Sequence, residues 1–176
     1  CAAVRPRWRM ADSTGYHTRV RRMRERDLGD VLRVERSAYE FPWSERVFRD
    51  CLRVGYSCWL ITSPAPIRSD VYGFAVMSMA AGEAHVLNLC IDAARHRAGL
   101  GRRMLGHLME VAANSGVQRM LLEVRPSNLA AVRLYERAGF DRIGTRKGYY
   151  PSNEGREDAT VMALDVSQST AAVSAS

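Results

Sequence analysis

Residues 94–109 read ARHRAGLGRRMLGHLM and place two glycines, Gly99 and Gly101, directly ahead of an amphipathic helical pattern. The first backbone N–H groups of a helix have no partner within the helix, and the helix dipole adds positive charge there. Glycines allow a ligand to approach those N–H groups closely, so the junction predicts a phosphate-binding turn. A glycine loop ahead of an ordinary core helix is the alternative.

Two familiar nucleotide motifs do not fit this junction. The dinucleotide fingerprint requires a third glycine where the chain has Met104, and the nucleotide-triphosphate loop requires a lysine after Gly106, where the chain has His107. The junction alone therefore leaves open which phosphate-bearing cofactor it holds.

The composition fits a globular protein of one domain. The chain has 176 residues and 47% hydrophobic content, with no apolar run near the ~20 residues of a membrane span. The start has no secretory pattern, so we expect a cytoplasmic protein that contacts no membrane. The cysteines form no CxxC pair and have no histidine at metal-ligand spacing, so no metal site is predicted. They are Cys1, Cys51, Cys58 and Cys90.

The positive charge is concentrated at the N-terminus. Of the net charge of +7, residues 1–26 contribute eight arginines against Asp12 and Glu25, which leaves 18 basic and 17 acidic residues in the rest. Such an arm could contact RNA, but a solvated arm is the favoured interpretation. We expect a disordered basic arm at 1–17, one domain at 18–165 and a disordered polar tail at 166–176.

Periodicity and turn residues predict an α/β domain with a mixed sheet of about seven strands flanked by four helices. Helices are expected after Asp27 and Ser44 as N-caps, from about Leu100 to Ser115, and after Asn128, with Gly116 and Gly139 ending the last two. Strands are expected in the runs HTRVRRM, SCWLITS, VYGFAVMSMA, EAHVLNLCI, RMLLEV, FDRIGTR and DATVMAL.

Three segments together resemble the GCN5-related N-acetyltransferase superfamily: LNLCIDAARHRAGLGRR, LLEVRPSNLAAVRLYERAGF and YYPSNEGREDATVMAL. Within it, FPWSERVF, LEVRPSN and GREDA resemble the bacterial ribosomal-protein alanine N-acetyltransferases. The resemblance covers roughly residues 18–164. Several motifs occur in the right order, which makes the match more specific than any one motif alone.

The resemblance implies acetyl-coenzyme A as the acetyl donor. It assigns the cofactor's pyrophosphate to the N–H groups of Arg97, Ala98, Gly99, Leu100, Gly101 and Arg102. It places the pantetheine arm along the main chain of Leu89, Cys90 and Ile91. One position departs from the superfamily pattern, because His96 stands where glutamine or arginine is usual. An exposed loop histidine is the expected role for it.

The resemblance also implies the acid–base pair. Glu123 matches the family's general base and Tyr135 its general acid, while Asn128 is expected to cap a helix and to contact the cofactor. The alternatives are a strand carboxylate paired with Arg119 or Arg125, and a tyrosine that is simply core. Three other acids, Glu35, Glu40 and Glu83, are expected to be solvated or structural, with Glu83 the substitute base if Glu123 is not one.

The implied reaction is acetylation of an N-terminal alanine, with small-subunit ribosomal protein eighteen as the substrate. The stretch YEFPWSE at 39–45 is expected to form one wall of the amine site. Alternatives are a broader N-terminal or lysine acetyltransferase, an acyl-coenzyme A binding module without catalysis, and an RNA-docking protein led by its basic arm.

Overall fold

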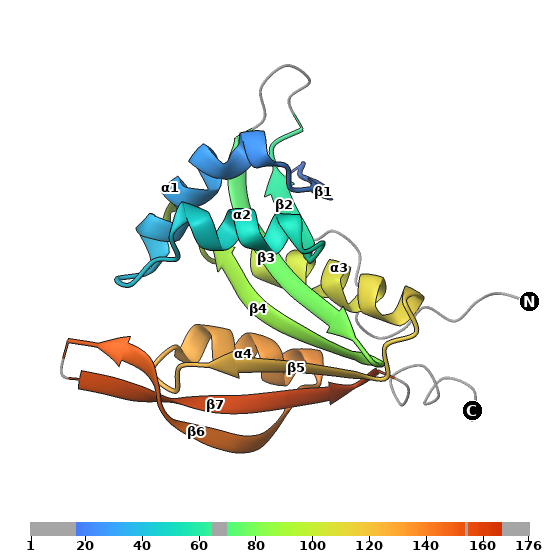
Figure 1. The fold of residues 1–176 in the computed structure, drawn as a ribbon, viewed down its shortest axis with the longest axis vertical. Helices are drawn as coiled ribbons and strands as arrows, with labels where there is room; N and C mark the ends of the chain where they lie inside the picture. Colours follow the sequence, from blue (N-terminus) through green and yellow to red (C-terminus); the bar gives the residue numbers. More distant parts are fainter. Residues whose placement is uncertain (1–16, 65–69, 154, 167–176) are drawn as a thin grey trace, which may run out of the picture. The chain divides into compact units, whose positions relative to one another are not determined.

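The computed structural model describes residues 17–64, 70–153 and 155–166. In this part of the chain seven strands form one mixed sheet in the order β1-β2-β3-β4-β5-β7-β6, with four α-helices (Figure 1). This confirms the predicted fold class. The basic arm and the polar tail lie almost wholly outside the described residues, so their boundaries stay predictions.

The element bounds follow the sequence pattern closely. The strands are β1 (Arg19–Arg22), β2 (Ser57–Thr62), β3 (Val71–Ala80), β4 (Glu83–Ile91), β5 (Arg119–Val124), β6 (Asp141–Ser152) and β7 (Gly155–Asp165). The helices are α1 (Leu28–Ala38), α2 (Glu45–Arg53), α3 (Leu100–Asn114) and α4 (Leu129–Ala138). Two short 3-10 turns are η1 (Glu25–Asp27) and η2 (Ala93–Arg95).

The chain divides into two compact units, which are described separately. The N-terminal unit lies within Ala11–Ser78 and Leu87–Leu108, and the C-terminal unit contains Met79–Val86 and the chain from Met109 onward. The first therefore carries α1, α2 and the start of α3, and the second carries β5, α4, β6 and β7.

The core of the N-terminal unit lies between its sheet and two helices. Helices α1 and α2 lie over β2 and β3 (Figure 1), and Cys58 and Leu60 of β2 belong to the cluster of buried residues there. The rings of Phe48 and Phe74 in this cluster meet edge to face at 5.3 Å. Side chains alternate along a strand, so Trp59 points the other way, where its ring meets His107 of α3 at 4.2 Å. Helices therefore cover both faces of this part of the sheet.

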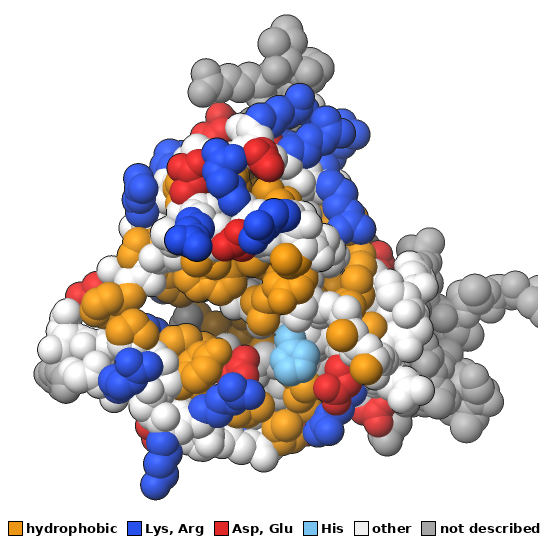
Figure 2. Space-filling view, in the orientation of Figure 1, with side chains coloured by type: hydrophobic (Ala, Val, Ile, Leu, Met, Phe, Trp, Pro, Cys, Tyr) orange, Lys and Arg blue, Asp and Glu red, His pale blue; other side chains and the backbone are white. Residues whose placement is uncertain are grey.

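The outer surface of α1 and α2 is rich in charge of both signs (Figure 2). Arg49 of α2, for example, pairs with Glu45 at 2.7 Å and with Glu25 at 2.8 Å. Such exposed pairs contribute little to stability, which is consistent with a solvated helical surface.

The predicted helix caps are only partly confirmed. Asn128 caps α4 by accepting the N–H of Ala131 at 3.1 Å, and Gly139 ends α4 with φ +97°. Asp27 and Ser44 precede α1 and α2 as expected, but neither side chain caps its helix. The Asp27 carboxylate instead accepts two bonds of 2.8 Å from the guanidinium of Arg21, a charge-assisted pair that outcompetes the helix N–H groups.

The C-terminal unit is organised around β5. Residues Glu83–Val86 of β4 pair in parallel with Arg119–Leu122 of β5, and β7 runs antiparallel on the other edge of β5. β6 pairs with β7 and is far longer than the predicted strand, which was expected to end near Arg146. The extension includes a bulge, described below, that a short-range pattern does not reveal.

Candidate active site

The predicted phosphate-binding turn has the backbone such a turn requires. Arg97 has φ +63° and Gly99 has φ +75°, and α3 begins at Leu100 directly after them. The N–H of Arg103 bonds to the carbonyl of Gly99 at 3.1 Å, so the main-chain hydrogen bonds of α3 start at Arg103, and the N–H groups of a first helical turn have no carbonyl partner within their own helix. A left-handed arginine is unusual and marks a constrained loop at a candidate binding site.

Cationic side chains lie near this turn, and each already contacts another group of the protein. The guanidinium of Arg95 lies 4.4 Å above the ring of Tyr72, and Arg103 donates to the carbonyl of Thr18 at 2.9 Å. His96 is exposed, as expected, yet its Nε2 lies 3.0 Å from the carbonyl oxygen of Ile91. Because that carbonyl can only accept, Nε2 carries the proton, and His96 ties the turn to the end of β4.

In the β4 segment predicted to contact pantetheine, two main-chain carbonyls already accept hydrogen bonds from side chains. The hydroxyl of Tyr39 donates to the carbonyl of Leu89 at 3.3 Å, and the carbonyl of Ile91 accepts from His96. The side chain of Cys90 is buried, as predicted. A ligand lying along this segment must therefore use main-chain N–H groups or replace these two hydrogen bonds.

Of the two roles expected for Glu35, solvated or structural, the structure shows the structural one. Glu35 is not solvated: it is 1% exposed and accepts from the N–H of Trp43 at 2.9 Å and from Nδ2 of Asn88 at 3.3 Å. Burial raises the pKa of Glu35, against the two hydrogen bonds. The glutamate thereby fastens the 39–45 stretch to β4. Its place on the apolar face of α1 was the available signal.

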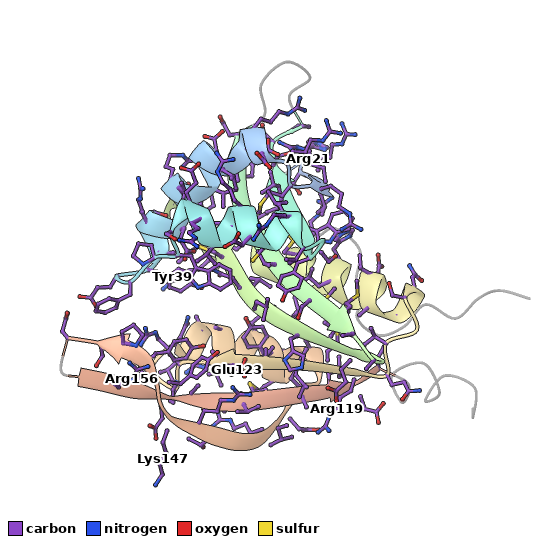
Figure 3. The ribbon with its side chains drawn as sticks, in the orientation of Figure 1. Arg21, Tyr39, Arg119, Glu123, Lys147 and Arg156 are labelled. Carbon is purple, nitrogen blue, oxygen red and sulfur yellow. The ribbon has the colours of Figure 1, made fainter. Side chains whose placement is uncertain are left out.

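Glu123 projects near the end of β5, where its carboxylate is largely shielded, with a side-chain exposure of 13% (Figure 3). Its Oε1 lies 3.3 Å from Nε of Arg146. The two alternative partners expected for Glu123 were Arg119 and Arg125, and the ion pair is formed with neither of them. Arg125 pairs instead with Glu157 at 2.9 Å. Arg146 was not foreseen, because it lies 23 residues away on β6.

Tyr135 is buried within the C-terminal unit, with its ring 5.9 Å from that of Phe140. Burial raises the pKa of Tyr135 to about 12, so the hydroxyl stays protonated at neutral pH and can serve as a proton donor. Its burial fits the core interpretation equally well, and the two roles are compatible.

Two tyrosines of β6 join this group. The hydroxyl of Tyr150 donates to the main-chain carbonyl of Glu123 at 2.9 Å, and its ring lies edge to face with that of Tyr149 at 4.9 Å. Burial, followed by the charges of Tyr149, Glu123 and Tyr135, raises the pKa of Tyr150. The segment YYPSNEGREDA was part of the family pattern, which was the signal for these residues, but it assigned no role to them.

The remaining acids lie elsewhere. Glu83 begins β4 opposite Arg119, four residues along β5 from Glu123, or about 13 Å at the usual strand rise. Glu40 is exposed. Among residues 17–64, 70–153 and 155–166, no group of His, Cys, Asp and Glu could hold a metal ion. None of the described helices is both long and apolar enough to span a membrane.

The predicted residues thus fall into two sets. Glu123, Asn128 and Tyr135 lie in the C-terminal unit, whereas Leu89, Cys90, Ile91 and the turn at 97–102 lie in the N-terminal unit. Within each unit the residues of a set are close along the chain, and their roles stay predictions.

Comparison with known proteins gives one consistent result. The acetyltransferase (GNAT) family profile matches residues 22–140. The chain is 38% identical over 141 residues to a protein of Escherichia coli (strain K12) named [ribosomal protein bS18]-alanine N-acetyltransferase, covering 80% of this chain and 93% of that one. It is 34% identical to a protein of the same name from Haemophilus influenzae, covering 78% and 91%.

Solved structures agree with the sequence comparison. The crystal structure of the ribosomal-protein-S18-alanine N-acetyltransferase from Escherichia coli matches with a TM-score of 0.78 and 35% identity, covering 85% of this chain and 94% of that chain. Both the profile match and the level of identity establish the family. The chain therefore belongs to the acetyltransferase (GNAT) family and is an acetyl-CoA-dependent N-acetyltransferase.

Proposed function

We propose that this enzyme acetylates the α-amine of the N-terminal alanine of ribosomal protein bS18. The observation that carries the proposal is that one unit, the C-terminal one, contains both a largely shielded carboxylate at Glu123 and a hydroxyl at Tyr135 that stays protonated near pH 7. The substrate comes from relatives at 34–38% identity that carry this activity in their names.

The residues of the N-terminal unit fit the coenzyme that the reaction needs. Acetyl-CoA would supply the acetyl group as a thioester. The left-handed turn at Arg97 and Gly99, followed at once by the start of α3, presents the N-terminus of a helix to a pyrophosphate. In this proposal Arg97–Arg102 hold the pyrophosphate, the main chain of Leu89–Ile91 holds the pantetheine arm, and Asn128 adds a contact beyond its capping bond.

Two residues of the C-terminal unit handle the protons. An α-ammonium group loses its proton near pH ~8, so a carboxylate base at Glu123 needs only to accept that proton as the nitrogen attacks. A C–N bond forms to the acetyl carbonyl carbon, the C–S bond breaks, and Tyr135 gives its hydroxyl proton to the departing thiolate. The second proton that the nitrogen loses on becoming an amide restores the Tyr135 hydroxyl. The raised pKa of Tyr135 keeps that proton available until the thiolate forms.

The 39–45 stretch is proposed to select the peptide. Of its aromatic residues, Tyr39 is bound to Leu89 and Trp43 packs against Phe48 at 5.5 Å, which leaves Phe41, 42% exposed, to contact an incoming peptide. Because Glu35 fixes the backbone at Trp43, the wall is rigid, and a rigid aromatic wall favours a small first residue.

The test is mass spectrometry of peptides incubated with purified enzyme and acetyl-CoA. We expect a peptide with a free N-terminal alanine to gain an acetyl group far faster than the same peptide with a blocked N-terminus and one internal lysine. Faster lysine modification would overturn the N-terminal assignment and leave only the family activity. Binding of the coenzyme with no transfer to either peptide would contradict the enzymatic proposal.

A further inference from the structure

The ion pair between Glu123 and Arg146 lies on a face of the sheet that the strand register defines. Glu123 of β5 stands opposite Val161 of β7, and Arg146 of β6 stands opposite Ala159. Val161 and Ala159 are two residues apart, so all four side chains project from the same face. The small side chain of Ala159 lies between the two charged groups and leaves the arginine free to reach across β7.

A bulge in β6 holds this arrangement. Lys147, Gly148 and Tyr149 stand opposite Asp158 alone, between the pairs formed by Arg146 and by Tyr150. Gly148 has φ +57° and donates its N–H to Oδ1 of Asp158 at 2.7 Å. Bulges next to active sites redirect side chains, and this one is closed by its own hydrogen bonds.

The bulge is fastened at both ends. Arg156 of β7 donates to the carbonyls of Gly148 and Tyr149, the latter at 2.9 Å. Beyond it, Tyr150 donates to the carbonyl of Glu123 at 2.9 Å, and the guanidinium of Arg146 lies 5.6 Å from the ring centroid of Tyr149. The segment therefore attaches to Glu123 through both its main chain and its carboxylate.

We propose that Arg146 is a positioning residue for acetyl transfer, which holds the Glu123 carboxylate in a fixed orientation while its positive charge opposes the protonated form of the incoming amine. The proposal rests on the proposed function, since it acts through Glu123 as the base. A cation beside the amine favours the neutral nucleophile over the ammonium ion, by the rule that like charges disfavour the charged form. The ammonium proton leaves to Glu123 or to solvent.

The other ionisable groups around this pair are few. Within the described parts of the chain they are Tyr149 and Tyr150 of β6, Tyr135 of α4, Arg125 directly after β5, and Glu157 of β7. Arg125 and Glu157 neutralise each other, and burial raises the pKa values of Tyr135 and Tyr150, so both phenols stay neutral near pH 7. Arg146 is therefore the cation that faces the Glu123 carboxylate.

The experiment compares Arg146→Gln, Arg146→Lys and the control Arg142→Gln. Arg142 lies four residues earlier on β6 and pairs with Glu136 of α4 at 2.8 Å, so it matches the target in strand and exposure but not in partner. The first measurement is kcat and KM for an alanine-starting peptide against pH at saturating acetyl-CoA. We expect Arg146→Gln to move the acidic limb of kcat upward by about half a pH unit or more and to lower kcat at pH 7 by roughly threefold.

The second measurement does not depend on turnover. It is calorimetry of the same peptide binding to enzyme with coenzyme A at pH 6. Arg146→Gln should bind the ammonium form of the peptide about threefold more tightly than the parent, or more, because no cation then competes for Glu123. Arg146→Lys should restore both the pH profile and the parent affinity. The control should match the parent in both measurements.

The outcomes are decisive in each direction. If Arg146→Gln matches Arg142→Gln in pH profile and peptide affinity, or if Arg146→Lys shifts them as far as Arg146→Gln, the inference is wrong.

A double variant with Glu123→Gln separates the two proposals, because the effect of Arg146→Gln should vanish in that background. If Glu123→Gln alone keeps parent turnover, the proposed base itself fails; if it loses turnover while Arg146→Gln behaves like the control, only the role of Arg146 fails.

Discussion

At the scale of single residues, Glu123 and Tyr135 can be distinguished by their pH behaviour. Glu123→Gln keeps the size and polarity of the side chain but cannot take a proton, so turnover at pH 7 should fall roughly 10²-fold. Part of the loss should return at higher pH, where solvent deprotonates the amine. The measurement is turnover against pH at saturating acetyl-CoA; parent-like turnover at neutral pH would contradict the assignment.

Tyr135→Phe should also slow turnover, by about tenfold or more, but without recovery at high pH. The parent phenol has a pKa of about 12, so it stays protonated throughout the assay range, and raising the pH supplies no substitute donor. Coenzyme affinity, measured by calorimetry, should be nearly unchanged in this variant. Recovery of turnover at high pH would instead indicate that the tyrosine serves the base rather than the leaving group.

The contributions of two buried carboxylates to the free energy of unfolding should change with pH in opposite directions. The pKa of Glu35 is raised above its ordinary value of 4.5, chiefly by burial, so the folded state holds its proton more tightly than the unfolded state. Its contribution is greatest below pH 4.5 and is lost as the pH rises through the folded pKa. The free energy of unfolding in urea, parent minus Glu35→Gln, should therefore decrease from pH 4 to pH 7.

Asp27 provides the contrasting case. Burial acts to raise its pKa, but the hydrogen bonds from Arg21 and from the N–H of Arg24 outweigh burial and lower it below 3.8. Its contribution is present above pH 3.8 and is lost as the pH falls through the folded pKa. The difference between parent and Asp27→Asn should thus increase with pH; two slopes of the same sign would show that one assignment is wrong.

At the scale of elements, two helices begin with the same Leu-Gly pair and allow a matched test. Gly101 is the second residue of α3 and Gly29 the second residue of α1. An added Cβ at Gly29 has nothing within 4 Å, so Gly29→Val should leave coenzyme binding unchanged. Gly101→Val should weaken acetyl-CoA binding in calorimetry, about tenfold or more if a bulky side chain blocks the pyrophosphate, while thermal unfolding stays cooperative.

The close contact between β3 and β4 makes a second prediction at this scale. A Cβ at Gly73 would lie 2.6 Å from the carbonyl oxygen of Cys90 and 2.5 Å from Cδ1 of Ile91. Since a backbone atom must move, Gly73→Ala should lower the free energy of unfolding by about 1–3 kcal/mol. Urea denaturation checks this, with Gly29→Ala as a control; equal stability of the two variants would show that the strands separate without cost.

The elements also show what a sequence pattern can predict. The strand runs of β2, β3 and β4 and the helix bounds of α3 and α4 were predictable because apolar periodicity and local turn residues specify them. The partner of Asp27 was not, because Arg21 competes for it from a different element. The β6 bulge also escaped prediction, since its hydrogen bonds to Asp158 and from Arg156 depend on the register between β6 and β7.

At the scale of the whole molecule, the thiols report on global unfolding. Cys51, Cys58 and Cys90 are free and buried, and burial raises the pKa of each, for Cys58 to about 11. Since the thiolate is the reactive form, these three should react slowly with a maleimide at pH 7.5 and rapidly in urea. Peptide mapping by mass spectrometry assigns each site; fast labelling of any one in native protein would reveal local opening there.

The family of the whole chain was predictable from its sequence, whereas the candidate site was less completely predictable. Short motifs in the right order predicted the family and the donor, and the roles that they assign to Glu123 and Tyr135 stay predictions. Arg146, Tyr150 and Asn88 escaped because each acts through a contact between segments distant along the chain. A local pattern contains no signal for such contacts.

The bulge has a practical consequence through its first residue. The chain contains one lysine, Lys147, alongside 25 arginines, and that lysine is exposed and extends away from Glu123 (Figure 3). An amine-reactive dye therefore has a single side-chain target, which lies next to Arg146 in the segment tied to the proposed base. Conjugated there, a fluorophore would report in real time when a peptide displaces the arginine, without any cysteine having to be introduced.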